Sequence, residues 1–120
     1  MEQNNKNTSH KEMTLNEYQN ESSKTRDKAN TPKIAYPAFG LCGEAGEVAD
    51  KLKKILRDKH GKILREDRLE IIKELGDVLW YVAQLALDLG YSLEDVARIN
   101  IEKLRDRQKR GVIGGSGDNR

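Results

Sequence analysis

Two long apolar repeats of helical period, joined by a short polar loop, constrain the fold of this chain most strongly. Apolar residues that recur at steps of three and four lie on one face of an α-helix. The polar segment 57–62, with Gly61 at its turn, separates the two repeats and predicts a helical hairpin. The positions of the first repeat are Ile34, Ala38, Leu41, Ala45, Val48, Leu52 and Ile55.

The second repeat, from about Arg65 to Leu89, is apolar nearly all round. Between Val78 and Leu87 only Gln84 is polar. A helix of this kind must be buried on all sides. Three other short helices cannot enclose it within one chain, so we expect this helix to pack against a second subunit as well.

Capping patterns predict two further helices. Thr14-Leu-Asn-Glu17 fits a capping box, so a helix is expected from near Thr14 to near Asn30. Ser92 and the acids that follow cap another helix that reaches about Lys109, and Pro37 places the start of the first long helix. No segment alternates as a strand does, so the expected fold is all-α: a four-helix bundle completed by oligomerisation.

Length and composition bound the organisation of the chain. Its 120 residues suffice for one domain, expected over residues 13–110, between a flexible N-terminus (1–12) and a glycine-rich C-terminal tail (111–120). The net charge of +2 argues against a nucleic-acid partner. We expect no membrane association and a cytoplasmic location. The N-terminus lacks the apolar region of a signal peptide, and the single cysteine, Cys42, forms no intramolecular disulfide.

Two pairs of acids lie beside the apolar faces. Glu44 and Glu47 are three residues apart in the first long helix, and Glu74 and Asp77 have the same spacing in the second. Residues at this spacing share a helix face. In an antiparallel hairpin turning near residue 61, Glu44 (17 positions before) matches Asp77 (16 after), and Glu47 (14 before) matches Glu74 (13 after). The sequence therefore predicts that four carboxylates meet.

Four carboxylates in a partly dry site require a counter-charge, and a divalent cation is the simplest one. Neither pair contains a histidine, and oxygen ligands alone favour Mg²⁺, with Mn²⁺ as a possible substitute. Because Mg²⁺ commonly shares its coordination with phosphates, a phosphate ligand is expected. The alternative interpretation is that these are solvated acids on helix surfaces. Two pairs at matching heights beside apolar stripes favour the metal site over this alternative.

The segments GEAGEVADKLKK, ELGDVLWYVAQLALDLG and NIEKLRDR resemble the MazG-type nucleoside triphosphate pyrophosphohydrolases. That family's E-x-x-E, spacer, E-x-x-D motif matches Glu44, Glu47, Glu74 and Asp77, with 26 residues between Glu47 and Glu74. The resemblance implies Mg²⁺-dependent cleavage of a (d)NTP between its α- and β-phosphates, in nucleotide-pool house-cleaning. It also implies a dimer or tetramer and leaves the base and sugar open. Glu47 is the candidate to accept the proton of the attacking water.

Further candidates would contact the nucleotide. Asn100 and Lys103 match the family's N-x-x-K element, and Arg107 follows one turn later. Lys51 and Lys54 continue the face of the first acid pair toward the helix end, where Lys51 alternatively forms an ion pair with Glu47. For all of these cations a solvated helix face is the competing interpretation.

Aromatic and amide side chains complete the prediction. Tyr81, one turn after Asp77, shares its face and is expected to stack on a base, whereas Trp80 is expected to point away into the core or a subunit interface. On the first helix, Gln19 and Tyr18 are candidates to read a base edge or cover the pocket. The acidic segment also contains four small residues, which we interpret as allowing the facing helix or a nucleotide to approach this helix closely. They are Gly43, Ala45, Gly46 and Ala49.

Two other functions stay open at this point. One is hydrolysis of phosphoribosyl-ATP, which uses the same carboxylate arrangement. The other is a non-enzymatic helical dimerisation or regulatory module, which retention of all four acids disfavours. The C-terminal tail has its own alternatives, since it is either a flexible end or a glycine-rich backbone that folds over phosphates.

Overall fold

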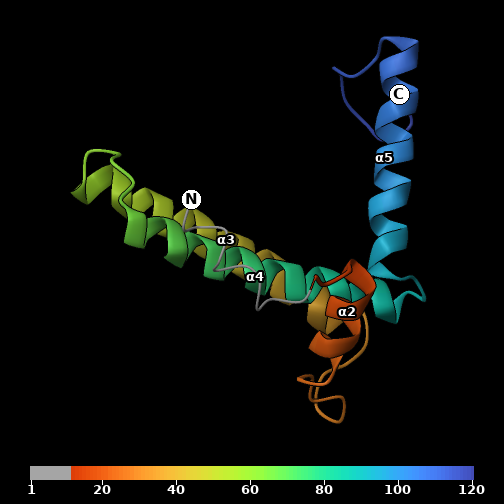
Figure 1. The fold of residues 1–120 in the computed structure, drawn as a ribbon, viewed down its shortest axis with the longest axis horizontal. Helices are drawn as coiled ribbons and strands as arrows, with labels where there is room; N and C mark the ends of the chain where they lie inside the picture. Colours follow the sequence, from red (N-terminus) through yellow and green to blue (C-terminus); the bar gives the residue numbers. More distant parts are fainter. Residues whose placement is uncertain (1–11) are drawn as a thin grey trace.

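The computed structural model describes residues 12–120 and consists, over that range, of α-helices without strands (Figure 1). The all-α prediction is confirmed; the second subunit that completes the bundle stays a prediction. The predicted flexible N-terminus, residues 1–12, falls outside the described residues except for Glu12. The helices are α2 (Leu15–Ser23), α3 (Ala35–Asp58), α4 (Arg65–Asp88) and α5 (Leu93–Arg110).

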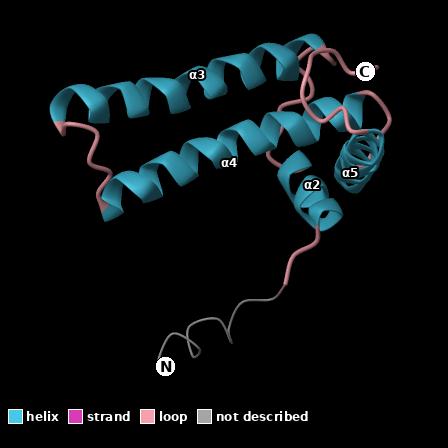
Figure 2. Ribbon diagram, turned by 90° about the horizontal axis from the view of Figure 1, so that it is seen from above, coloured by secondary structure: helices cyan, strands magenta, loops and turns pink. Residues whose placement is uncertain are grey.

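Helices α3 and α4 form the predicted antiparallel hairpin and run side by side along most of their length (Figures 1 and 2). His60 and Gly61 turn the chain at φ 53° and 78°, the left-handed region that suits glycine. Asp67 then fixes the start of α4, because its carboxylate accepts the N–H of Leu64 at 2.9 Å and pairs with Lys59 at 2.8 Å. The turn therefore sets the register of the two long helices.

Helix α2 crosses one end of the hairpin and packs on α4 and α5. Its capping box at Thr14 and Glu17 forms as predicted. The predicted extension to Asn30 is wrong, because the helix ends at Ser23. Beyond it, Asp27 accepts the N–H of Ala29 at 3.2 Å, a local side-chain bond that competes with helical hydrogen bonding.

Helix α5 leaves the end of the hairpin at a steep angle instead of lying along it (Figure 1). Ser92 and Asp95 form its N-terminal capping box, and Gly111 ends it in the left-handed conformation at φ 71°. A polar network fixes this joint. The Gln19 amide donates to the carbonyls of Ala83 (3.0 Å) and Tyr91 (3.2 Å) and accepts the N–H of Leu93 (3.0 Å).

Apolar side chains along α4 remain uncovered within the single chain. The side chains of Leu69, Ile72 and Leu75, which recur at helical spacing, are 57%, 58% and 46% exposed. The single chain buries Ala83, Gln84 and Ala86 near the α2 end of α4 and leaves the larger apolar residues nearer the turn open. No helix in the described part of the chain is long and apolar enough to cross a membrane.

Candidate functional site

Three carboxylates from the two long helices converge midway along the hairpin. Glu44 on α3 and Glu74 and Asp77 on α4 each contribute one oxygen, and these oxygens lie within 4.8 Å of one another. Glu44 and Glu74 are partly buried, and Asp77 is exposed. The matched heights of these residues about the turn, as the sequence predicts, bring the two helices' acids together.

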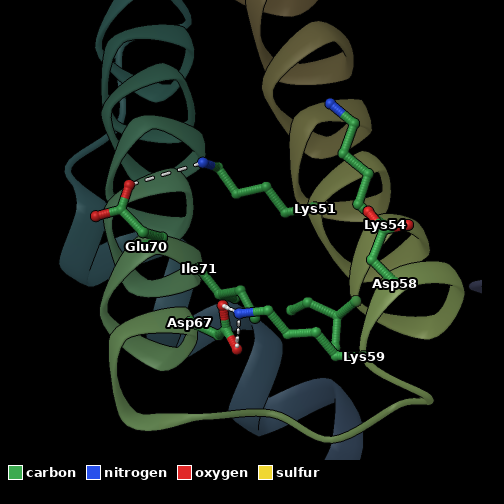
Figure 3. Close-up of a pocket in the computed structure, with 8 residues that line it drawn as sticks. Lys51, Lys54, Asp58, Lys59, Asp67, Glu70 and Ile71 are labelled. Atoms are coloured by element: carbon green, nitrogen blue, oxygen red, sulfur yellow. Dashed lines mark hydrogen bonds and ion pairs between the residues drawn. The ribbon is translucent and has the colours of Figure 1, made fainter.

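The charges in this acidic cluster repel one another. Partial burial raises the pKa of Glu44, and the negative charges of Asp77 and Glu74, a hydrogen bond with Glu74 and the charge of Glu47 raise it further. The nearest cation is Lys51, whose ammonium lies 3.6 Å from a Glu74 oxygen and 3.8 Å from Glu70. Figure 3 shows Lys51 reaching from α3 toward Glu70 on α4. One shared ammonium is insufficient to neutralise three acids.

These residues fit a hard divalent cation. The donor set of Glu44, Glu74 and Asp77 is oxygen only, its oxygens are close enough to share one ion, and their mutual repulsion is relieved by positive charge. Mg²⁺ takes few carboxylates and fills its remaining positions with water or phosphate oxygens. A three-carboxylate cluster on an open surface is consistent with that preference.

Glu47 does not join the three converging acids. It is exposed, one turn along α3 from Glu44, although its negative charge still contributes to the raised pKa of Glu44. The structure therefore brings together three of the four predicted carboxylates and leaves the fourth beside them.

An aromatic wall borders the acidic cluster. Thr25, Trp80 and Tyr81 line a depression of about 280 Å³ together with Glu44 and Asp77. The expectation that Trp80 points away from Asp77 is wrong. Positions three and four residues after Asp77 both lie near its face, so Trp80 and Tyr81 flank that face from either side. The depression is slightly smaller than the pockets that usually enclose a whole small-molecule ligand.

Hydrogen bonds and close packing hold the two aromatic rings. The Trp80 indole N–H donates to Thr25 Oγ1 at 2.8 Å and to the Ser22 carbonyl at 3.2 Å. Tyr81 lies against Gly40, where a Cβ in place of the glycine hydrogen would come within 2.1 Å of the ring. The pKa of Tyr81 is raised, first by a hydrogen bond with Tyr36 and then by burial.

Close approach in the hairpin thus depends on Gly40. A Cβ added at Gly43, Gly46 or Gly76 would meet nothing within 4 Å. The interpretation that Gly43 and Gly46 let the facing helix approach is therefore wrong within one chain. Gly40 stands outside the acidic motif, one turn before Glu44, and no pattern in the sequence marks it as the point of contact.

The two residues predicted on α2, Tyr18 and Gln19, have different surroundings in the structure. Burial, followed by the negative charge of Asp77, raises the pKa of Tyr18, so this phenol lies within range of that charge. Gln19 is buried, and its amide is occupied by backbone groups of α4 and the α5 start. Gln19 therefore fixes the joint and leaves no free edge for a base. No pattern in the α2 sequence alone separates the two roles.

The predicted cations lie in different places. Lys54 pairs with Asp50 on its own helix at 2.9 Å, and Lys51 is the one that meets the acidic cluster. On α5, Asn100 is exposed, while Lys103 and Arg107 pair with Asp118 of the C-terminal tail at 3.0 and 3.2 Å. Asn100 and Lys103 line a depression with Ala86 and Leu89 at the end of α4, and none of the three α5 residues belongs to the acidic cluster.

Thr25 is a site residue that the sequence patterns did not predict. It follows α2 in a segment that was expected to be helical, and only the early end of that helix turns it toward Trp80. The segment is held by Arg26, whose guanidinium donates to both oxygens of Asp88 at 2.8 and 2.9 Å. Nothing in the local sequence marks these two residues as partners.

Comparison with known proteins identifies relatives of the chain. The family model described as MazG nucleotide pyrophosphohydrolase domain matches residues 38–112. The Gene 37 protein of Mycobacterium phage L5 is 58% identical over 87 residues, covering 72% of this chain and 76% of the phage protein. The uncharacterized protein YvdC of Bacillus subtilis (strain 168) is 40% identical over 72 residues, covering 56% and 68%. No solved structure matches the chain.

Proposed function

Because the chain belongs to the MazG nucleotide pyrophosphohydrolase domain family, we propose that it hydrolyses nucleoside triphosphates between the α- and β-phosphates. The products are a nucleoside monophosphate and pyrophosphate, and the role is nucleotide-pool house-cleaning. The observation that carries this proposal is the convergence of Glu44, Glu74 and Asp77 within 4.8 Å beside an aromatic wall. Such a site combines cation binding with room for part of a nucleotide.

The residues around the acidic cluster divide the work. Mg²⁺, or Mn²⁺ in its place, held by Glu44, Glu74 and Asp77 supplies positive charge that offsets the charge of the phosphate oxygens. In the hydrolysis, the oxygen of water bonds to a phosphorus of the α–β bridge, the bond from that phosphorus to the bridging oxygen breaks to separate the monophosphate from pyrophosphate, and the water proton passes to a carboxylate. Glu47 is our candidate for that carboxylate, since it lies beside the cluster without joining it.

Other side chains position the substrate in this proposal. Tyr81 and Trp80 flank Asp77 and offer ring faces or edges to a base. Lys51 already offsets the charge of Glu74, and a bound cation would free its ammonium for a phosphate oxygen. Lys54 is the weaker candidate, because Asp50 holds it on the surface of its own helix.

We also propose that the chain works as a homo-oligomer, a dimer or a tetramer. Monomeric proteins seldom expose large contiguous apolar patches, yet α4 exposes Leu69, Ile72 and Leu75 at helical spacing. Since α5 projects from the hairpin, an assembly would allow Asn100, Lys103 and Arg107 of a neighbouring copy to contact the substrate. Sedimentation of the purified chain tests this, and a monomer at micromolar concentration would refute it.

The decisive experiment is an assay of pyrophosphate and orthophosphate release from a panel of NTPs and dNTPs. We expect pyrophosphate with Mg²⁺ and none with a chelator. Glu74→Gln removes one carboxylate of the cluster, and Glu70→Gln, one turn earlier on α4 and also near Lys51, is its matched control. Activity should fall about 100-fold or more in the first and remain in the second.

The same assay separates the competing functions. Pyrophosphate release from phosphoribosyl-ATP with no activity on the NTP and dNTP panel would replace the proposed substrate class. No release from any nucleotide, with an intact oligomer, would instead leave a helical interaction module. Activity that survives Glu74→Gln at its original level would contradict the proposed role of the acidic cluster.

A further inference from the structure

One carboxylate holds both ends of the connecting segment that joins α2 to α3 (residues 24–34). Near the start of this segment, Arg26 donates to both oxygens of Asp88, at 2.8 and 2.9 Å. At its end, the N–H of Ile34 donates to Oδ2 of the same carboxylate at 2.8 Å. The Arg26 and Asp88 side chains are 3% and 5% exposed, and hydrogen bonds shielded from water in this way are stronger than exposed ones. Asp88 therefore closes the connecting segment into a loop.

The connecting segment ends in a strained turn. Ile34 has φ 67° and ψ −62°, and the N–H of Ala35 bonds to the Lys33 carbonyl at 2.6 Å. These values describe a γ-turn of the rare, strained kind, which a β-branched residue disfavours further. Such a conformation persists only where the surrounding structure imposes it. The hydrogen bond from the Ile34 N–H to Asp88 fixes this turn directly.

Each end of the connecting segment leads to one ring of the aromatic wall. Thr25, at its start, accepts the Trp80 indole N–H at 2.8 Å. Tyr36, two residues beyond its end, shares a hydrogen bond with Tyr81, and the two ring centroids lie 6.1 Å apart. Trp80 and Tyr81 meet edge to face, with centroids 5.0 Å apart, and both line the depression beside the acidic cluster. The positions of both rings thus depend on the connecting segment.

We propose that Asp88 is a positioning residue for the nucleotide: by closing the connecting segment it fixes Trp80 and Tyr81, and it thereby sets nucleotide affinity without touching the substrate. This role rests on the proposed function. The acids of the cluster, in contrast, come from the middle of the hairpin, where the register of α3 and α4 brings them together. Loss of the Asp88 charge should therefore weaken nucleotide binding and leave the affinity for a divalent cation unchanged.

Fluorescence of the full chain without ligand tests the hold on the rings directly, since Trp80 is the one tryptophan of the sequence. In Asp88→Asn the side chain no longer neutralises Arg26, so we expect the Trp80 emission to shift to longer wavelength and acrylamide to quench it more strongly. Asp67→Asn is the matched control, because Asp67 also pairs with a basic side chain and accepts a backbone N–H, at the turn of the hairpin. An emission shift in both folded variants, or in neither, would overturn the proposal.

Kinetics with the NTP and dNTP panel test the consequence for the substrate. We expect KM to rise about tenfold or more in Asp88→Asn while kcat changes less, because misplaced rings weaken binding and leave the reacting groups in place. Calorimetric titration with Mg²⁺ alone should give the same affinity for the natural chain and for this variant. A fall in kcat with KM unchanged, or a weakened Mg²⁺ affinity, would assign Asp88 to the fold as a whole and overturn the positioning role.

A double-mutant cycle tests whether Asp88 acts through the connecting segment. Thr25→Val keeps the shape of the side chain and removes the acceptor of the Trp80 N–H, so it should by itself shift the emission and raise KM. This variant also tests the proposal if Asp88→Asn does not fold. Combined, the two changes should raise KM by less than the product of their separate effects, because they act through one contact. Effects that multiply would overturn the proposal.

The fluorescence measurement also separates this role from the proposed function. An emission that responds to Asp88→Asn and Thr25→Val, in a chain that hydrolyses no nucleotide, would retain the hold on the two rings and refute the hydrolase. Hydrolysis with KM unaltered by both changes would retain the hydrolase and refute the positioning role.

Discussion

Two aspartates on α4 show how differently the fold uses one residue type. Asp77 and Asp88 are eleven residues, or about three turns, apart, so they lie on nearly the same face of the helix. Asp88 is almost fully buried and accepts hydrogen bonds from Arg26 and from the N–H of Ile34. Asp77 is exposed and faces two other acids, Glu44 and Glu74.

The two aspartates differ in the charged groups that surround their carboxylates. A buried carboxylate that receives a bidentate guanidinium is neutralised, and its contribution is structural. A carboxylate placed among other carboxylates needs a charge from outside the chain, which makes that position suited to a ligand. Asp88 also binds Arg26, in the segment that places Thr25 against Trp80. Asp88 therefore supports the wall of the site in which Asp77 lies.

The largest expected effect is on activity. Asp77→Asn keeps the shape of the side chain and removes one charge from the acidic cluster, so kcat/KM for the best nucleotide should fall about 100-fold or more. The melting temperature without metal should stay the same or rise, because repulsion is reduced. Nucleotide kinetics and thermal melting of one preparation measure both. A large loss of stability in this variant would mean that Asp77, like Asp88, stabilises the fold, and it would contradict the comparison.

The second expected effect is on stability. Asp88→Asn leaves the Arg26 guanidinium buried without its counter-charge and should lower the free energy of unfolding by about 3 kcal/mol. Chemical denaturation measures the loss. Asp58→Asn, in an exposed pair with Arg57, is the control and should show no measurable change. Equal stability of the two variants would contradict the structural role of Asp88.

The same contrast has a pH dependence. Arg26 and the N–H of Ile34 lower the pKa of Asp88 below its ordinary value of 3.8. A lowered folded-state pKa means that this stabilisation is complete above the ordinary pKa and is lost as pH falls through the lowered one. The stability difference between the natural chain and Asp88→Asn should therefore shrink below about pH 4. A difference that stays constant down to pH 2 would contradict this linkage.

A smaller effect is expected at the wall beside Asp77. Gly40→Ala places a Cβ within 2.1 Å of the Tyr81 ring and should cost about 1 to 3 kcal/mol through overpacking. Gly43→Ala meets nothing and should instead stabilise α3 by about 0.5 to 1 kcal/mol. Denaturation of both variants gives the comparison. Stabilisation by both alanines would show that Tyr81 moves aside freely.

The smallest expected effect concerns repulsion within the acidic cluster. Burial and neighbouring negative charges raise the pKa of Glu44, so ionising this carboxyl costs more free energy in the folded chain than in water. Without metal, Glu44→Gln should raise the melting temperature by about 2–4 °C, while the further rise produced by Mg²⁺ in the natural chain should disappear. Scanning calorimetry with Mg²⁺ and with a chelator tests both parts. A Mg²⁺-induced rise that persists in Glu44→Gln would remove Glu44 from the proposed ligand set.

Much of the hairpin was predictable because its determinants are local or periodic. Apolar spacing set the two long helices, capping residues set the starts of α2 and α5, and equal distances from the turn paired Glu44 with Asp77. Where the prediction was wrong, local turn bonds and remote contacts decided. The segment beyond the early end of α2 is held by a local bond from the Ala29 N–H to Asp27, whereas the position of Trp80 depends on its hydrogen bond to the segment that Arg26 ties to Asp88.

The sequence by itself determined the helical class, the hairpin and the meeting of acids from two helices, because periodicity and counting along an antiparallel pair suffice for these. Only the tertiary structure decided which acids remain without a counter-charge. Asp77 and Asp88 occupy almost the same helical face, and what separates them is an arginine 62 residues before Asp88 that reaches only one of the two. Long-range pairing of this kind leaves no period in the sequence, and burial then fixes its consequence by removing the pair from water.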